Sequence, residues 1–231
     1  TICIAVLLRQ ELNRKYVTYN AMLPKILTMG CEKYKSIRDI SIKTEEMYGT
    51  YIHSDILKKG DNQVIEFLIE FVEDKVHLED IFEFLKEIIL NPLVENGQFK
   101  EEYFNKAKQI TKDTILSRQN DKKELAKDRC IETMCKSEKF GILADGYIED
   151  LENNKIENKK LYNHYLDILK TAEIDIFVIG DVKEETIKNM TLKYFNIENR
   201  NYKPLKLDFV YKEKVRENTV IEKCNITQGK L

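Results

Sequence analysis

The chain has 231 residues, with 38 basic and 40 acidic side chains, a formal net charge of −2 and 42% hydrophobic residues. This size and hydrophobic content are enough for a packed core, in one large domain or two small ones. Acidic and basic residues are interspersed and nearly equal in number, so the protein has no strong positive field that would attract nucleic acid. No apolar run reaches the roughly 18 residues of a membrane span. We therefore expect neither a nucleic-acid partner nor a membrane-spanning segment.

The first third of the chain predicts a strand, two helices and a hairpin. In the first helix, Pro24 falls in the first turn, where its missing N–H is tolerated, and Gly30 ends the helix. Ser36 is the expected N-cap of the second helix. Alternating apolar and polar residues around a Gly60 turn indicate the hairpin. The predicted elements are strand 2–8, helix 20–29, helix 36–47 and hairpin 51–71.

The rest of the chain predicts mostly amphipathic helices and one more strand. The β-branched apolar run over 174–179 is typical of a buried central strand. Residues 199–231 are polar and read as a linker that leads to a strand near Thr219. The predicted helices are 78–90, 99–117, 121–135, 158–169 and 183–194. This order favours an α+β fold, with a mostly antiparallel sheet and helices packed on one face.

The residues alone predict no catalytic centre. The histidines, His53, His77 and His164, stand far apart, and no phosphate-binding or nucleophile motif is present. The five cysteines are odd in number and lack metal-binding or redox spacing. Reduced thiols in a cytoplasmic protein are the simplest interpretation. The cysteines are Cys3, Cys31, Cys130, Cys135 and Cys224.

Five short strings follow one another along nearly the whole chain. They are Gly30-Cys31-Glu32-Lys33-Tyr34-Lys35-Ser36, Glu46-Met47-Tyr48-Gly49-Thr50, Leu90-Asn91-Pro92, Phe140-Gly141 and Ile174-Asp175-Ile176-Phe177-Val178-Ile179-Gly180-Asp181. In this order they resemble the pitrilysin/insulinase-type metallopeptidases, the inverzincins, a family that includes mitochondrial processing peptidase. The resemblance implies the single-domain repeat of that α+β fold.

The family binds zinc through His-x-x-Glu-His on the helix before the first of these strings. Counting back from Gly30 places the motif at Ala21, Pro24 and Lys25. None of these residues can bind a metal ion or activate a metal-bound water. The third ligand, a glutamate, would fall near Glu101 or Glu102. The resemblance therefore implies zinc in active relatives and predicts no cofactor and no activity for this chain.

The sequence looks like a degenerate bacterial member of the family, in which such domains occur in pairs. We expect a peptidase-like domain over 1–198, with its first strand clipped, and a linker over 199–231 that begins a second, absent repeat. In active relatives an extended peptide adds to the strand after the Tyr-Gly element. The resemblance therefore gives four candidate peptide contacts, although an ordinary edge strand is also consistent with them. These are Ile52, His53, Ser54 and Asp55.

Three functions remain open. The first is a non-catalytic domain that supports a larger peptidase assembly or holds peptide, with a second homologous domain or subunit as its partner. In the second, the chain completes an active zinc metalloendopeptidase whose catalytic site lies in another domain or subunit. The third is an unrelated α+β adaptor.

Overall fold

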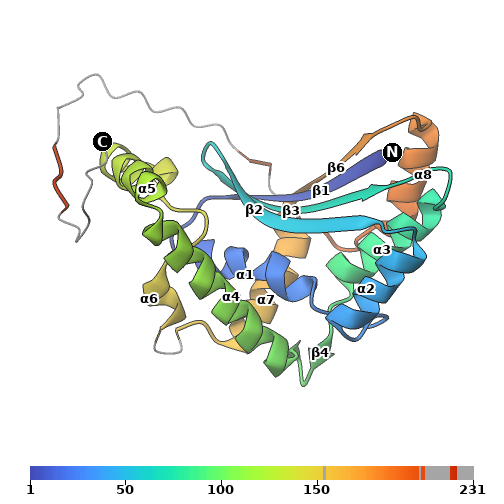
Figure 1. Cartoon of the computed structure of the whole chain (residues 1–231), viewed down its shortest axis with the longest axis horizontal. Coiled ribbons are helices and arrows are strands. Elements are labelled where there is room, and N and C mark those ends of the chain that lie inside the picture. The colour runs from blue at the N-terminus through green and yellow to red at the C-terminus, as the bar shows by residue number, and fades with distance from the viewer. Residues whose placement is uncertain (153–154, 203, 206–218, 223–231) are drawn as a thin grey trace.

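A four-stranded antiparallel sheet forms the centre of the fold (Figure 1). The computed structural model describes residues 1–152, 155–202, 204–205 and 219–222. The strands lie in the order β2-β3-β1-β6, so β2 and β6 are the edges. Every neighbouring pair is antiparallel, with Val6 opposite both Phe67 and Ile176. The strands are β1 (Ile2–Glu11), β2 (Tyr51–Lys59), β3 (Asn62–Phe71) and β6 (Glu173–Ile179).

Helices cover one face of this sheet, with α1, α3, α4 and α7 beneath it in Figure 1. The longer helices are α1 (Val17–Leu27), α2 (Ile37–Glu46), α3 (Leu78–Leu90), α4 (Glu101–Asn120), α5 (Lys122–Met134), α7 (Asn158–Thr171) and α8 (Glu184–Tyr194). Short elements complete the fold, namely β4 (Val94–Glu95), β5 (Gln98–Phe99), a 3-10 turn at Lys139–Gly141 and α6 (Ile148–Leu151). The expected α+β architecture is confirmed. Among the described residues, no helix has the length and apolar character to cross a bilayer.

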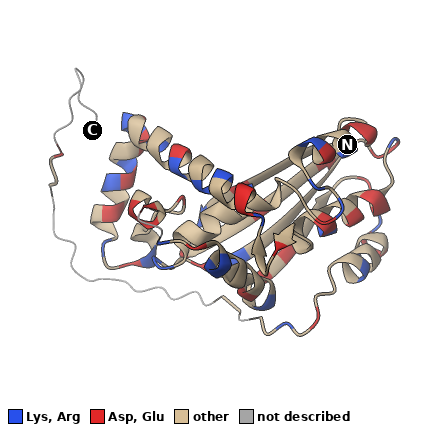
Figure 2. Ribbon diagram, turned by 90° about the horizontal axis from the view of Figure 1, so that it is seen from below, with Lys and Arg blue, Asp and Glu red and all other residues tan. Residues whose placement is uncertain are grey.

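The core lies between the sheet and these helices. Alternate residues of β1 point into it, which explains why Ile4 and Val6 are fully buried while Cys3 and Ala5 are half-exposed. Phe67 and Ile69 on β3 continue the same buried layer. From the helix side, α3 contributes an apolar stripe that includes Phe82 and Leu85. On the outer surface, acidic and basic residues alternate along the helices (Figure 2).

The expected central strand at 174–179 is an edge strand, so that prediction is wrong. Among the described residues β6 pairs with β1 alone, and its side chains are all half-exposed or exposed. Phe177 is 55% exposed and Ile179 73% exposed, and they lie opposite Ala5 and Cys3, which point away from the core. A continuous apolar run shows that a strand forms, but its place in the sheet depends on pairing that the run does not encode.

The first helix also begins earlier than expected, at Val17. The backbone N–H groups of Tyr16 and Val17 both donate to the carbonyl of Asn13, which starts the helix there. Pro24 therefore lies in the interior of α1 and not in its first turn. Because proline has no N–H, the carbonyl of Asn20 loses its usual helical donor.

The other predicted helices are found within a few residues of their expected ends, and Ser36 caps α2 by accepting from the N–H of Asp39 at 3.2 Å. The strand expected near Thr219 is not formed within 219–222, and most of 199–231 lies outside the described residues. The proposed domain boundary at residue 198 therefore stays a prediction.

A chain of buried amides fixes α1 against the sheet. Asn20 donates from Nδ2 to Gln63 Oε1 at 2.8 Å, and both residues are at most 2% exposed. Gln63 Nε2 donates to the carbonyls of Val17, at 3.0 Å, and Ala144, at 2.6 Å. His164 on α7 contacts Asn20 Oδ1 through Nε2 at 2.7 Å. One network thus joins α1, β3, α7 and the segment around residue 144.

Two phenylalanines on the sheet provide a test of this core. Phe67→Ala removes a fully buried ring and should lower the free energy of unfolding by about 3–5 kcal/mol. Phe177→Ala, on the exposed edge, should lower it by less than about 1 kcal/mol. Urea unfolding followed by circular dichroism measures both. Equal losses would contradict the edge position of β6.

His164 should make stability depend on pH. Burial lowers the pKa of its imidazole to about 4, against 6.5 for the free side chain. As pH falls from 6.5 towards 4, the unfolded chain binds a proton that the folded protein does not, so stability should fall by up to about 3 kcal/mol. His164→Gln retains an amide for Asn20 and should remove this component. Parallel stability–pH curves for the two proteins would contradict the prediction.

Candidate functional site

The three positions expected for the zinc motif lie together on α1, directly beneath β2. Ser54 of β2 donates from Oγ to the carbonyl of Pro24 at 3.1 Å, so the edge strand and this turn of the helix are in direct contact. Ala21 and Pro24 are buried, and Lys25 is half-buried. The Lys25 ammonium donates to the carbonyl of Ala21 at 3.0 Å.

These residues do not fit a zinc ion. Ala21 has no donor atom, and Pro24 offers only a backbone carbonyl that already accepts from Ser54 and from the Thr28 hydroxyl at 2.8 Å. Lys25 adds a positive charge where a metal would need an electron-pair donor. The part of the chain that the structure describes contains no group of three or more His, Cys, Asp or Glu residues able to hold a metal ion.

The two glutamates expected near the position of the third zinc ligand have other partners. Glu101 and Glu102 are exposed at the start of α4. Glu101 accepts from Asn158 Nδ2 at 2.8 Å, and Glu102 forms an ion pair with Lys100 at 3.1 Å. Neither belongs to the buried residues of α4, which are Tyr103, Phe104, Ala107, Thr111 and Ile115.

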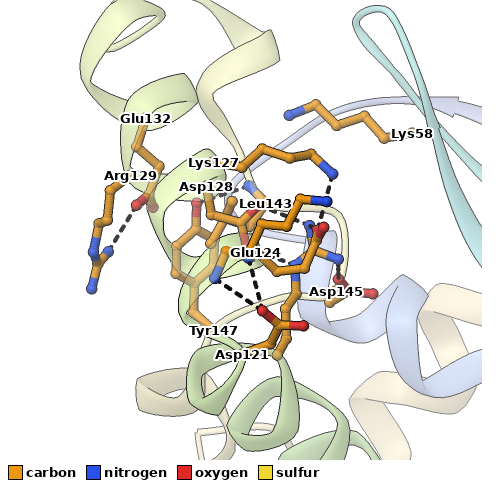
Figure 3. A network of polar contacts seen from close by, with 12 residues as sticks. Lys58, Asp121, Glu124, Lys127, Asp128, Arg129, Glu132, Leu143, Asp145 and Tyr147 are labelled. Carbon is orange, nitrogen blue, oxygen red and sulfur yellow. Dashed lines mark hydrogen bonds and ion pairs between the residues drawn. The ribbon is translucent and has the colours of Figure 1, made fainter. Parts of the chain in front are cut away.

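A charged cluster around Arg118 lines a cleft together with Asp55 and Lys58 of β2. Figure 3 labels its members Glu124, Asp128 and Asp145. Arg118 on α4 binds Asp128 of α5 through two parallel bonds, Nε–Oδ2 at 2.6 Å and Nη2–Oδ1 at 2.8 Å. It also reaches Glu124 at 3.3 Å and Asp145 at 3.5 Å. Two-point binding of a guanidinium by a carboxylate is among the stronger polar contacts in proteins. It clamps α4, α5 and the segment around Asp145 together.

Two clefts open beside this cluster and share Asp55, Arg118 and Asp145. The first has a volume of ≈370 Å³ and reaches past Lys58 to an apolar wall that includes Phe140. The second, of ≈650 Å³, extends along α4. Burial raises the pKa of the Asp145 carboxyl, because the charged form loses hydration there. Burial lowers the pKa of Lys25 for the same reason.

Lys58 attaches the far end of β2 to the cleft wall. Its ammonium donates to the carbonyl of Ile142 at 2.9 Å and to that of Phe140, and it lies over the Phe140 ring. Burial lowers the pKa of this ammonium as well. β2 is therefore held at both Ser54 and Lys58, while its outer edge pairs with no described strand.

The four candidate peptide contacts divide between the two sides of β2. Ile52 packs partly against the core, and Ser54 contacts α1. His53 is exposed and stacks on Tyr51, with ring centroids 6.3 Å apart. Asp55 is exposed and lines both clefts. Of the four, Ser54 is the residue that the structure places in contact with a motif position.

The cluster of Arg118, Asp128 and Asp145 is absent from the sequence-based prediction. A signal for part of it does exist in the sequence. Asp121 separates two amphipathic helices and caps the second by accepting from Lys123 N at 2.9 Å. Helices joined by so short a break bring residues on either side of it together, and Arg118 and Asp128 lie on either side. No sequence feature near Asp145 indicates that this residue contacts Arg118.

The comparisons with known proteins agree with this geometry. No protein-family model matches the chain. It is 28% identical over 237 residues to a probable inactive metalloprotease of Bacillus subtilis, a match to all of this chain and 55% of that protein. A conserved protein of Enterococcus faecalis superimposes with a TM-score of 0.82 at 24% identity, over 93% of this chain and 51% of that one. Pitrilysin superimposes with a TM-score of 0.65 at 15% identity, over 90% of this chain and 22% of its own length.

The chain thus spans about half the length of the first two proteins. The predicted hairpin is β2–β3, and it belongs to the same sheet as β6, with β1 between them. This shared architecture favours the fold of these proteins over an unrelated α+β fold. The whole chain contains three histidines, none in a His-x-x-Glu-His sequence. The chain therefore shares its fold with pitrilysin, resembles a probable inactive metalloprotease along its whole length, and contains no His-x-x-Glu-His sequence.

Proposed function

We propose that this chain is the non-catalytic half of a larger protein or complex and that it holds peptide without cleaving it. The observation that carries the proposal is the contact between Ser54 and Pro24. It keeps the α1 turn beneath an edge that pairs with no described strand, while Ala21, Pro24 and Lys25 on this turn offer no metal-binding side chain. An open edge offers main-chain hydrogen bonds to an extended peptide.

The binding surface would be the outer edge of β2, with Ile52, His53, Ser54 and Asp55 at its centre. Main-chain pairing supplies affinity, and the clefts beside Asp55 would receive side chains that point down from the bound strand. β6 is the other edge of the sheet, but neither cleft reaches it. This difference favours β2 over β6 as the strand edge that binds peptide.

The partner would be a second homologous domain or subunit. Support comes from the length of the Bacillus and Enterococcus proteins, each of which is about twice the segment that matches this chain. We place the domain itself at 1–198 and its connection to the partner within 199–231. A cytoplasmic location fits the free thiols of Cys3, Cys31, Cys130 and Cys135, which a reducing compartment would preserve.

The absence of zinc chemistry can be measured directly. The purified chain, dialysed against equimolar zinc and then against buffer, should retain no stoichiometric metal in elemental analysis. Since a ligand that binds only the folded state raises the melting temperature, added zinc should leave that temperature unchanged. Stoichiometric zinc that survives dialysis, together with hydrolysis of a peptide pool, would overturn the proposal.

Peptide capture on β2 predicts a local change in amide exchange. Hydrogen–deuterium exchange is measured with and without an excess of a randomised decapeptide pool. Amides within 51–59 should exchange more slowly with peptide present, because a bound strand pairs with the outward-facing N–H groups. The β6 segment 173–179 is the matched control and should not change. Protection of β6 alone, or of neither strand, would contradict binding at β2.

A further inference from the structure

The Lys25 ammonium is an unusual charge for the place it occupies. It is half-buried, and its hydrogen bond goes to the carbonyl of Ala21 on its own helix. No described carboxylate forms an ion pair with it. An ammonium has three N–H donors, and burial without a partner anion is costly. Two donors of Lys25 therefore remain for a group that comes from outside this set of residues.

This ammonium lies on the turn of α1 that contacts β2. The Ser54–Pro24 hydrogen bond places the adjoining turn of α1 against the strand. The carboxylates whose charge acts on Lys25 are Asp145 and Asp55, and both of them line the two clefts. A peptide along the outer edge of β2 would pass over this point.

The other basic groups around the two clefts already have partners. Arg118 is bound by Asp128, Glu124 and Asp145, and Lys127 is bound by Glu124 at 2.9 Å. Lys58 is held by two carbonyls and an aromatic ring. Lys25 therefore differs from each of them, since its hydrogen bond goes to a carbonyl of its own helix.

The negative charges nearby are themselves partly engaged. Asp145 faces Arg118 at 3.5 Å. Asp55 accepts from the N–H of Ile56 at 2.8 Å and is exposed, so water and salt weaken its field. An incoming anion would therefore meet the ammonium of Lys25 with limited repulsion from these two carboxylates.

We propose that Lys25 binds a carboxylate of the held peptide, so that a lysine provides the positive charge at the motif position. The inference rests on the proposed peptide-holding function. An ammonium can form charge-assisted hydrogen bonds with a carboxylate, but it cannot act as a Lewis acid towards water. The carboxylate is either the C-terminus of the peptide or an Asp or Glu side chain.

Four fluorescein-labelled decapeptide pools separate these sources. The first has no acidic side chain and a free C-terminal carboxylate, and the second is the same pool with a C-terminal amide. The third and fourth are amidated pools with Glu or Gln at one fixed position. Fluorescence anisotropy of the wild-type chain should show about tenfold tighter binding of the first pool over the second, or of the third over the fourth.

Three variants assign the effect to a residue. Lys25→Met should abolish the preference for the carboxylate and leave unchanged the binding of the second and fourth pools, which contain no carboxylate, and Lys25→Arg should keep the preference. Lys188→Met, at an exposed lysine of α8 that lines neither cleft, is the control and should also keep it. Thermal melts verify folding, and Lys25→Gln replaces Lys25→Met if the latter is unfolded.

The outcomes distinguish this inference from the function on which it rests. Equal binding of acid and amide pools by the wild-type chain overturns the role of Lys25 and leaves peptide holding intact. The same conclusion follows if Lys25→Met keeps the preference or Lys188→Met removes it. If the wild-type chain binds no pool, both proposals fail.

Discussion

The hydrogen bond between the buried amides of Asn20 and Gln63 is the constraint on which the site depends. Both side chains are nearly inaccessible to water, so each must find its partners inside the protein or leave costly unpaired groups. Gln63 finds them on α1 and at Ala144, and Asn20 finds a further one at His164. These requirements fix the rotation of α1 beneath the sheet. They therefore determine which face of that helix, with Lys25 on it, meets the edge of β2.

Two parts of the molecule make the site without a metal. The amide network positions α1, and the two-point contact of Arg118 with Asp128 positions α4 and α5 on the other side of the clefts. In a zinc peptidase the metal would join the helix to its ligands. Here the sheet, the amides and the guanidinium hold the same region together, and a lysine supplies the positive charge. A site of this kind can retain the shape needed for binding while the chemistry of hydrolysis is lost.

Local sequence signals predicted the elements well, because spacing and caps act over a few residues. Ser36 caps α2 as expected, and the hairpin around Gly60 forms. Signals that depend on distant partners were misread. The β-branched run of β6 looks like a central strand, but its order in the sheet is set by which strand pairs with β1. The motif positions on α1 followed from family resemblance alone, while Asp145 reaches the site through contacts that leave no local trace.

The most direct test of the account is a crystal structure of the chain with a bound decapeptide that has a free C-terminal carboxylate. The account predicts that the peptide forms a fifth strand on the outer edge of β2, with a carboxylate within hydrogen-bonding distance of Lys25 Nζ. A peptide found on the β6 edge or on the uncovered face of the sheet would contradict it. A metal ion bound at Lys25 and its neighbours would contradict it as well.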